Sequence, residues 1–324
     1  MKSPHVVALL LVGARREPFL AAVLAGLEAC VDDLVVHDNS GLPSSPNREV
    51  IERSALYASG RVSVFEAPFV SFSQARNESL AHARQRRRID SDTWLLAVDA
   101  DEVHGADLAF ITRRLLPSLP RRVGAVDAYY YNFMLSFDLY NALNRRHNLL
   151  VRHNDGLHWA HDVHEQLHGV EGRRICMPYA FHHYGYVRTT DDIVQKWRLY
   201  HDLGDRTRTA RTLDELSDEA IFLGEVDQVM PYRGQYPEAL AVLGDTNPLL
   251  DPSLERFRSL VEARQRVLSA RLRTEARAAN YRLRLLWRAT QLLFEFPRLP
   301  DAGRLLRMTL GGRSPADWAP RHAV

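Results

Sequence analysis

The sequence of 324 residues is poor in cysteine and lysine, carries little net charge and has no long apolar run. Its two cysteines, Cys30 and Cys176, show no disulfide or metal-binding spacing, which favours a reducing, cytoplasmic location. The formal net charge of +2 creates no overall field that would attract nucleic acid, so we expect no such partner. No run approaches the roughly 20 apolar residues that a membrane-spanning helix needs. These absences leave an ordinary globular enzyme or binding protein.

Lysine is nearly missing, because Lys2 and Lys196 are the only two among 42 basic residues. A bound phosphate would therefore be held by arginine, by backbone groups or by a metal ion. The amino-terminal stretch MKSPHVVALLLVGARRE places a lysine before an apolar run, as a signal peptide does. The run is short, however, and Arg15, Arg16 and Glu17 follow it, so we interpret it as a first strand.

Short apolar runs alternate with helical patterns over the first hundred residues. Strands are expected at 6–14, 33–41, 62–68 and 94–98, and helices at 18–30, 46–59 and 71–88. Such alternation predicts an α/β fold with a mostly parallel sheet flanked by helices. Ligands of these sheets bind at the carboxyl ends of the strands.

The second half of the chain is less regular. We expect a helix near 106–116, a strand at 123–135, then a histidine-rich section with ICMPYAFHHYGY at 175–186, and helices from about residue 189 onward. This pattern predicts a catalytic α/β domain at 1–200 and a helical, arginine-rich region at 201–324. Between Arg256 and Arg288, ten arginines face only two glutamates and interleave with leucine and tryptophan. That stretch fits peripheral contact with anionic lipid at the inner membrane face, a homodimer contact, or a solvated helix face.

Acidic residues follow two of the expected strands. In WLLAVDADEVH (94–104), Asp99 and Asp101 lie two residues apart and leave the strand end on one face. Asp38 and Asn39 end the strand at 33–41 in the same way. Carboxylates held that close repel each other unless a cation lies between them. The pair therefore either binds a charged ligand or is solvated at the opening of a loop.

Five segments in order, VVHDNSG, FSQARNESLAHA, WLLAVDADE, WAHDVHEQL and HHYGY, together resemble family-2 glycosyltransferases with the GT-A fold. The resemblance covers roughly residues 5–200, and the last two segments resemble a bacterial branch of that family. It implies a Rossmann-like sheet and transfer of a sugar from a nucleotide diphosphate sugar to an acceptor hydroxyl. The implied enzyme is hexosyltransferase-like, inverting and metal dependent, and its acceptor is a glycan, a lipid or a small molecule.

The resemblance also assigns roles to particular residues. It implies that Asp38 holds the nucleotide base or ribose, and that Arg76 and Asn77 lie near the sugar nucleotide. Asp99 would reach ribose or metal, and Asp101 would bind the Mg²⁺ or Mn²⁺ that bridges the diphosphate. Hard oxygen ligands of this kind suit either ion.

Three further residues complete the implied site. His183 resembles a histidine that completes the metal shell in some members, and a histidine bonded within the core is an equally good interpretation. Glu165 is the candidate base that deprotonates the acceptor, with Asp162 in reserve and His164 or Glu102 as other options.

Other interpretations stay open. VDADEV also fits phosphatases of the haloacid-dehalogenase type, in which Asp99 would be the nucleophile, although three strand–helix units precede the motif here. The chain could instead be a nucleotide-sugar-binding module without activity. A zinc site on His158, His161 and His164 is the weakest alternative, because no HExxH motif occurs. Five aromatic residues could stack on sugars or belong to the core: Trp94, Tyr129, Tyr130, Tyr131 and Trp159.

Overall fold

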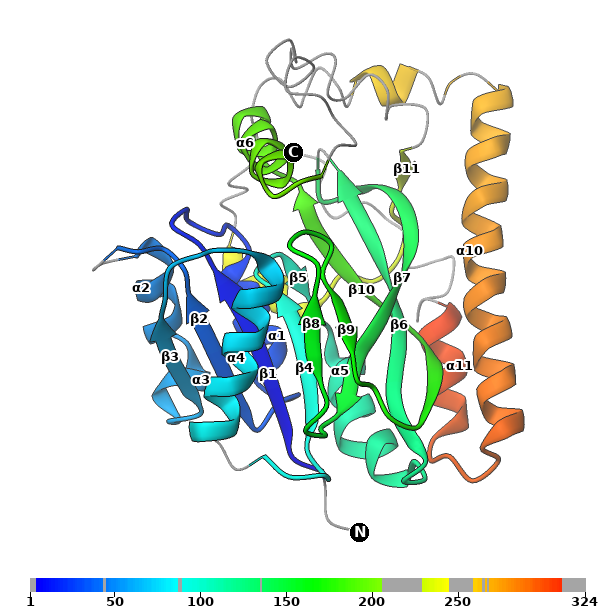
Figure 1. Cartoon of the computed structure of the whole chain (residues 1–324). Helices are drawn as coiled ribbons and strands as arrows, with labels where there is room; N and C mark the ends of the chain where they lie inside the picture. The colour runs from blue at the N-terminus through cyan, green and yellow to red at the C-terminus, as the bar shows by residue number, and fades with distance from the viewer. Residues whose placement is uncertain are drawn as a thin grey trace.

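The structure, a computed structural model, describes residues 4–42, 45–86, 89–134, 136–205, 229–244, 259–263, 266 and 268–310. A large curled β-sheet forms its centre, with helices packed against it and a long helix along one side (Figure 1). The predicted α/β, Rossmann-like architecture with a helical C-terminal region is therefore confirmed.

The amino-terminal half of the sheet is parallel. It contains β1 (Val6–Val12), β2 (Asp33–Asp38), β3 (Val62–Glu66) and β4 (Trp94–Asp99) in the order β3-β2-β1-β4. The helices between them are α1 (Leu20–Leu27), α2 (Pro46–Glu52), α3 (Ala55–Ala58) and α4 (Phe72–Arg86). All four strands lie where the apolar runs predict them.

Both faces of β1 are buried, which explains its uninterrupted apolar sequence. Val6, Ala8 and Leu10 pack in one cluster with α1, whereas Val7 and Leu9 pack in a second cluster that includes side chains of α4. Helices therefore cover both faces of the sheet, and the carboxyl ends of its parallel strands remain the edge at which a ligand can bind.

The rest of the sheet is mixed. It adds β5 (Glu102–Val103), β6 (Val123–Met134), β7 (Leu139–Arg152) and β10 (Arg173–Tyr186), in the order β4-β7-β6-β10-β5. β7 runs antiparallel to both β4 and β6. Sequence analysis does not predict this strand, because polar residues interrupt its apolar pattern at 144–148.

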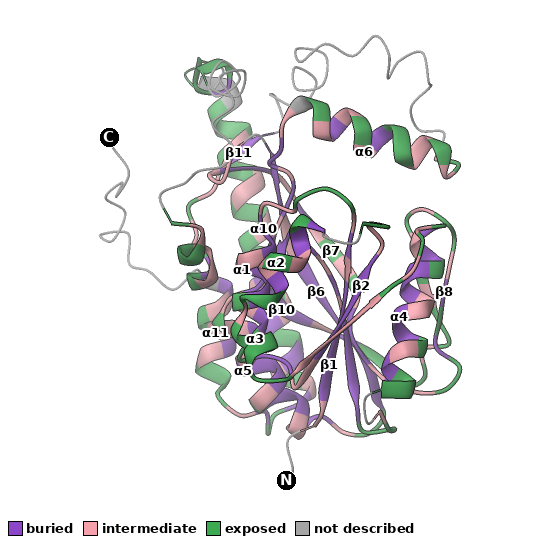
Figure 2. Cartoon of the chain, turned by 90° about the vertical axis from the view of Figure 1, so that its left-hand side faces the viewer, coloured by how far each residue is buried: buried purple, intermediate pink, exposed green. Residues whose placement is uncertain are grey.

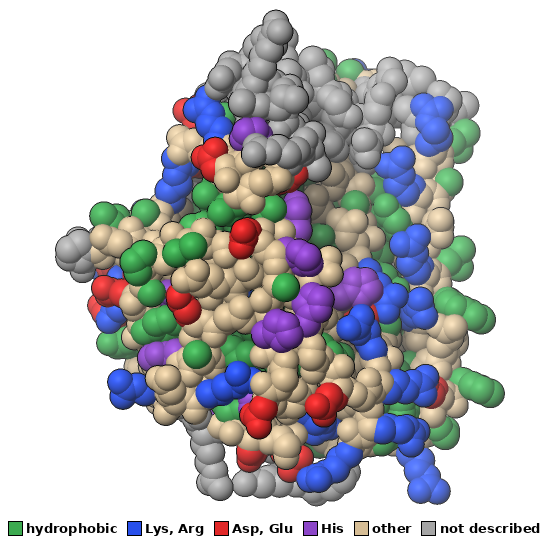
Figure 3. Space-filling model, viewed as in Figure 1, with side chains coloured by type: hydrophobic (Ala, Val, Ile, Leu, Met, Phe, Trp, Pro, Cys, Tyr) green, Lys and Arg blue, Asp and Glu red, His purple; other side chains and the backbone are tan. Residues whose placement is uncertain are grey.

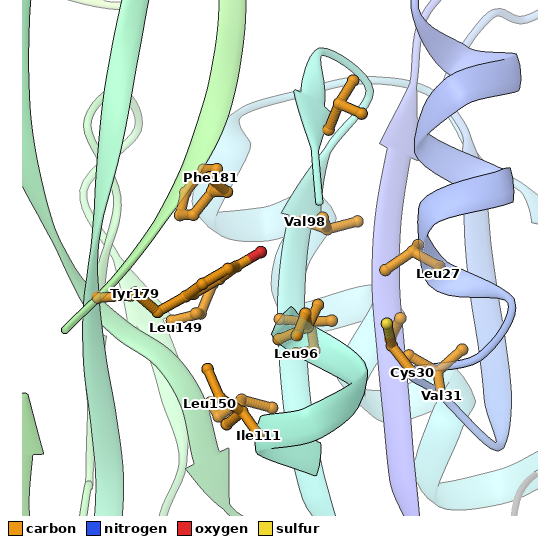
Figure 4. Close-up of a cluster of buried hydrophobic side chains, with 14 of the residues drawn as sticks. Leu27, Cys30, Val31, Leu96, Val98, Ile111, Leu149, Leu150, Tyr179 and Phe181 are labelled. Atoms are coloured by element: carbon orange, nitrogen blue, oxygen red, sulfur yellow. The ribbon is translucent and has the colours of Figure 1, made fainter. Parts of the chain in front are cut away.

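Shorter elements complete the region around β7. β8 (His158–Ala160) and β9 (Gln166–His168) form a separate two-stranded sheet. α5 (Ala106–Phe110) continues as a π-helical turn (Ile111–Leu115) and a 3₁₀ turn (Leu116–Ser118). Figure 4 shows how this segment packs, with Ile111 near Leu96 of β4 and Leu150 of β7.

The C-terminal region packs directly on the sheet. It contains α6 (Thr190–Asp202), β11 (Met230–Pro231), the 3₁₀ helix η3 (Glu238–Leu243), α10 (Leu268–Glu295) and α11 (Ala302–Leu310). β11 pairs with β7, and Leu292, Phe296 and Leu305 belong to the same core cluster as β1 and β4. Figure 2 shows that the strands of the sheet are mostly buried, whereas the helices around them also carry intermediate and exposed residues. Among the described residues, no helix is both long and apolar enough to cross a membrane.

Candidate functional site

Asp38 and Asp99 lie close together at one edge of the sheet. The register pairs Asp38 with Val12 and Asp99 with Leu11, so the two acidic residues flank consecutive residues of β1. The Asp38 carboxylate is buried and accepts a hydrogen bond of 2.9 Å from the backbone N–H of Ser40. The structure thus brings the predicted strand-end carboxylates to the place where ligands of parallel sheets bind.

Arg76 connects three parts of this edge. Its guanidinium is 1% exposed and donates to the carbonyl oxygens of Leu9 and Val98, at 3.2 and 3.1 Å. It also forms ion pairs with the carboxylates of Asp99 and Glu165. A buried cation needs this many partners to offset its lost hydration. Arg76 therefore holds Asp99 next to Glu165, which lies 66 positions later in the sequence.

Asp101 and Glu102 are buried, whereas Asp99 is partly exposed. Arg188 Nη2 lies 3.2 Å and Lys196 Nζ lies 3.8 Å from the Oδ2 atom of Asp101. Burial by itself raises the pKa of Asp101, but neighbouring His183, Lys196 and Arg188 outweigh it and hold the pKa well below its usual range. Asp101 Oδ1 has no hydrogen-bond partner although it is buried. An ionised carboxylate oxygen of this kind is a place for a cation.

His183 faces that oxygen. Its Nε2 atom lies 3.4 Å from Asp101 Oδ1, and its Nδ1 atom lies 2.8 Å from Asn132 Oδ1. The amide nitrogen of Asn132 donates to Asn141 at 2.9 Å, which assigns the oxygen of Asn132 to His183. With this amide orientation, a neutral His183 ring donates from Nδ1 to Asn132 and leaves Nε2 as an acceptor toward Asp101. Burial lowers the pKa of His183, in keeping with a neutral ring.

Gly185 allows this ring position. A Cβ atom added at Gly185 would lie 2.6 Å from Cε1 and 2.8 Å from Nε2 of His183. Any side chain there would push the imidazole away from Asp101. The glycine of the HHYGY segment therefore has a steric role in the cluster.

Glu102 lies just behind the two aspartates. Its Oε2 atom accepts a hydrogen bond of 3.1 Å from the backbone N–H of Asp99, and its Oε1 atom lies 3.9 Å from Arg146 Nη1. Burial raises the pKa of Glu102 to about 8 despite Arg146. Glu102 thus supports the strand end from inside the protein.

The candidate bases differ in their surroundings. Glu165 is half-buried and forms an ion pair with Arg76 at 3.3 Å, whereas Asp162 is exposed in the loop between β8 and β9. The backbone carbonyl of Asp162 accepts a hydrogen bond of 3.1 Å from Phe72 N–H, which holds this loop against α4. His164 is exposed and lies 3.4 Å from Asp205. Of these groups, Glu165 is the one joined to Asp99 through a shared guanidinium.

Asn77 is engaged with the protein backbone. Its amide donates to the carbonyl of Trp159 at 2.8 Å and accepts from the N–H of Trp159 at 2.7 Å. Both polar ends of the side chain therefore hold β8 against α4. Trp159 itself, like Trp94 and Tyr129, is buried in hydrophobic clusters, which supports the core interpretation for these three aromatic residues.

Sequence reasoning named Arg76 but missed three other cations of the site. Arg188 lies between β10 and α6, Lys196 lies in α6, and Arg146 lies in β7. The one available signal was Lys196, since it is one of only two lysines in the chain. The charges of these residues balance much of the acidic cluster.

The predicted metal ligands do not form a complete metal site in the structure. Within the described ranges, no three His, Cys, Asp or Glu side chains come together as a ready metal site. That statement covers Asp99, Asp101 and His183 as well as the histidine row His158, His161 and His164. The histidine row is visible on the surface near β8 and β9 (Figure 3). The pair Asp101–His183 offers two ligands, and others would come from the substrate or water.

A cavity of about 1220 Å³ lies elsewhere, between β10, η3, α10 and α11. Tyrosine and arginine side chains line it, among them Tyr131, Tyr232 and Arg282. His182 borders this cavity, whereas its neighbour His183 faces Asp101, because adjacent strand residues point to opposite faces. The cavity and the strand-end cluster are therefore separate features.

No protein-family model matches the sequence, and no curated protein sequence is similar to it. Two solved structures show a distant likeness. The structure of residues 1–349 of TarS from S. aureus is 12% identical, with a TM-score of 0.33, and the match covers 91% of this chain and 92% of that one. A 4-diphosphocytidyl-2C-methyl-D-erythritol synthase is 13% identical, with a TM-score of 0.31, over 46% of this chain and 75% of that one. Likenesses this weak carry no argument about function.

Proposed function

We propose that this chain is a glycosyltransferase that moves a sugar from a nucleoside diphosphate to an acceptor hydroxyl with the help of Mg²⁺ or Mn²⁺. One observation carries the proposal. The buried Asp101 Oδ1 lies 3.4 Å from His183 Nε2 and has no hydrogen-bond partner, at the strand end that also carries Asp99. A carboxylate oxygen and a ring nitrogen that face each other without a hydrogen bond match the needs of a cation.

The chemistry of the donor set fits a divalent ion. Carboxylate oxygen and a neutral imidazole whose other nitrogen is hydrogen-bonded are common metal ligands, and Asn132 supplies that second bond. When bound, such an ion neutralises the charge that develops on a departing diphosphate. Arg188 and Lys196 add fixed positive charge at the same place.

The proposal also assigns roles to Asp38, Arg76 and Asn77. Asp38 would hold the ribose or base at the end of β2. Arg76 and Asn77 are positioning residues in this proposal, because Arg76 is buried and Asn77 bonds the backbone of β8.

Glu165 is the proposed base, with Asp162 as the second candidate. Glu165 would accept the proton of the acceptor hydroxyl, and attack from the face opposite the leaving group would invert the anomeric carbon. Its ion pair with Arg76 fixes the carboxylate to the same guanidinium that binds Asp99.

The test compares nucleotide binding in matched variants. Melting temperatures are measured with uridine, guanosine and thymidine diphosphates, with Mn²⁺ or with EDTA, for wild type, Asp101→Asn and His183→Gln. We expect a shift in the wild type that needs Mn²⁺ and that both variants lose, since a ligand raises the melting temperature only where it binds the native state. Sugar transfer should fall by about a hundredfold or more.

Asp92→Asn is the matched control, because Asp92 is exposed in the turn before β4 and pairs with Arg121 at 3.1 Å. It should keep the Mn²⁺-dependent shift. Equal shifts in EDTA, or an unchanged shift in Asp101→Asn, would contradict the metal role. Release of phosphate from simple monoesters by the wild type would favour the phosphatase with Asp99 as nucleophile. Binding without any turnover would indicate an inactive binding module.

A further inference from the structure

The outer face of α10 exposes four large apolar side chains. Leu272 is 56% exposed, Leu283 64%, Trp287 62% and Phe294 92%. At about 100° per residue, the four lie within about 60° of one another around the helix axis, so they form one stripe. Figure 3 shows hydrophobic side chains projecting along the edge of the molecule where Figure 1 places α10. A stripe of this size on a protein surface marks an interaction site.

Arginines border this apolar stripe on one side. Arg273 and Arg284 lie along that side, and both are exposed. Arg271 and Arg282 lie farther round the helix and line the cavity next to α10. The acidic residues of α10 are already engaged, because Glu275 pairs with Arg271 at 2.9 Å and Glu295 pairs with Arg173. The exposed face is therefore apolar along its middle and positive along one border.

The opposite face of α10 anchors the helix to the protein. Leu285, Ala289 and Leu292 are buried, and Leu292 belongs to the main core. The helix has 28 residues, and the stripe from Leu272 to Phe294 extends over about 33 Å of it. The buried side chains of the inner face pack α10 against the core. Folding therefore does not require the apolar side chains on the outer face.

We propose that α10 lies flat in the interface of an anionic lipid bilayer, with the stripe Leu272–Leu283–Trp287–Phe294 inserted at the boundary of headgroups and acyl chains. Arg273 and Arg284 reach the lipid phosphates while their aliphatic stems cover the apolar edge. A second copy of the chain is the poorer occupant, because pairing the two stripes would bring the arginine borders of both copies together. Anionic lipid supplies the opposite charge instead. This inference is independent of the proposed transferase activity.

The test uses the full chain and vesicles of defined composition. Binding is measured by co-sedimentation with phosphatidylglycerol–phosphatidylcholine vesicles and with vesicles of phosphatidylcholine alone. We expect binding to the anionic vesicles only, weakened by high salt. Trp287→Ser combined with Phe294→Ser should lower the affinity by about tenfold or more, because both inserted rings are lost. Arg273→Gln combined with Arg284→Gln should lower it by a similar factor on anionic vesicles.

A control variant and a tryptophan fluorescence measurement accompany the vesicle assay. Tyr57→Ser removes another exposed aromatic ring, on α3, and should leave binding unchanged. Tryptophan emission should shift to the blue on vesicle addition, and Trp287→Phe should keep binding but lose the shift. Absence of binding to anionic vesicles, or unchanged binding by the Trp287→Ser/Phe294→Ser variant, would overturn the proposal. So would a dimer in solution that this variant dissociates, since a second copy would then cover the stripe.

Discussion

At the scale of single residues, buried charge organises the site. Arg76 is surrounded by two backbone carbonyls and two carboxylates, and Asp101 is surrounded by Arg188, Lys196 and His183. Removing one member of such a cluster leaves its partners buried and unpaired, which costs more than the contact itself contributed. The carboxylates therefore hold their places before any ligand arrives.

His104 gives a prediction of pH dependence at this scale. Burial and, to a smaller extent, the charge of Arg146 lower its pKa to about 3, so the ring stays neutral in the folded protein at pH 5. The unfolded chain takes up a proton below about pH 6.5, and stability is therefore lost as the pH falls, by about 1.4 kcal/mol per pH unit from this residue. His104→Gln should reduce the slope of unfolding free energy between pH 6.5 and about 5 by that amount.

Urea unfolding at several pH values measures this slope. Some slope should persist in the variant, because burial also lowers the pKa of His182 to about 3. The exposed residue His158 provides the control, and His158→Gln should leave the slope unchanged. An equal slope in wild type and His104→Gln would show that His104 is protonated in the folded state.

At the scale of elements, the β8–β9 hairpin depends on α4. This two-stranded sheet carries the loop with Asp162 and Glu165, and it does not pair with the main sheet. Its links to the core include the Asn77–Trp159 bonds, the Phe72–Asp162 backbone bond, the Arg76–Glu165 ion pair and the packing of Trp159. Small two-stranded sheets are marginal alone, so α4 sets the position of the candidate base.

Asn77→Ala should loosen this hairpin. Loss of both side-chain hydrogen bonds leaves the backbone of Trp159 without partners there, at a cost of about 1–3 kcal/mol. Hydrogen exchange of the amides of 158–168 should become faster, while exchange in β1 stays the same. Gln74→Ala, on the exposed face of the same helix, should change neither. Unchanged protection of 158–168 in Asn77→Ala would mean that other contacts hold the hairpin.

At the scale of the whole molecule, the C-terminal helices share the core of the sheet. Leu292 of α10 and Leu305 of α11 lie in one cluster with β1, β4 and α1. The division at residue 200 therefore stays a prediction about sequence regions, whereas the packing unites α10 and α11 with the sheet.

Leu292→Ala should destabilise the whole protein by about 2–5 kcal/mol, because it leaves a cavity in the shared core. Leu283→Ala, on the exposed face of the same helix, should change stability by less than about 0.5 kcal/mol. Guanidinium unfolding followed by circular dichroism should show one shifted transition for Leu292→Ala. A second, separate transition would show instead that the helical region unfolds independently of the sheet.

The local pattern of apolar and polar residues in the sequence determined much of this fold. The four parallel strands and their helices follow from apolar runs of the right length, and the exposed stripe of α10 is visible as leucine and arginine at helical spacing. β7 was missed because Asn144, Arg145, Arg146 and His147 interrupt its apolar pattern. Asn144, Arg145 and Arg146 lie in a strand because they pair with β6, and β4 pairs with the same strand farther along, at 150–152.

For the site, the sequence by itself placed Asp38, Asp99 and Asp101 at strand ends, because a strand end is a local property of the chain. Only the tertiary structure decided which cations neutralise them. Arg76 lies 23 positions from Asp99, and Arg188 lies 87 positions from Asp101. Such partners meet only after the strands have taken their order in the sheet, since an ion pair depends on distance in space and leaves no spacing in the sequence.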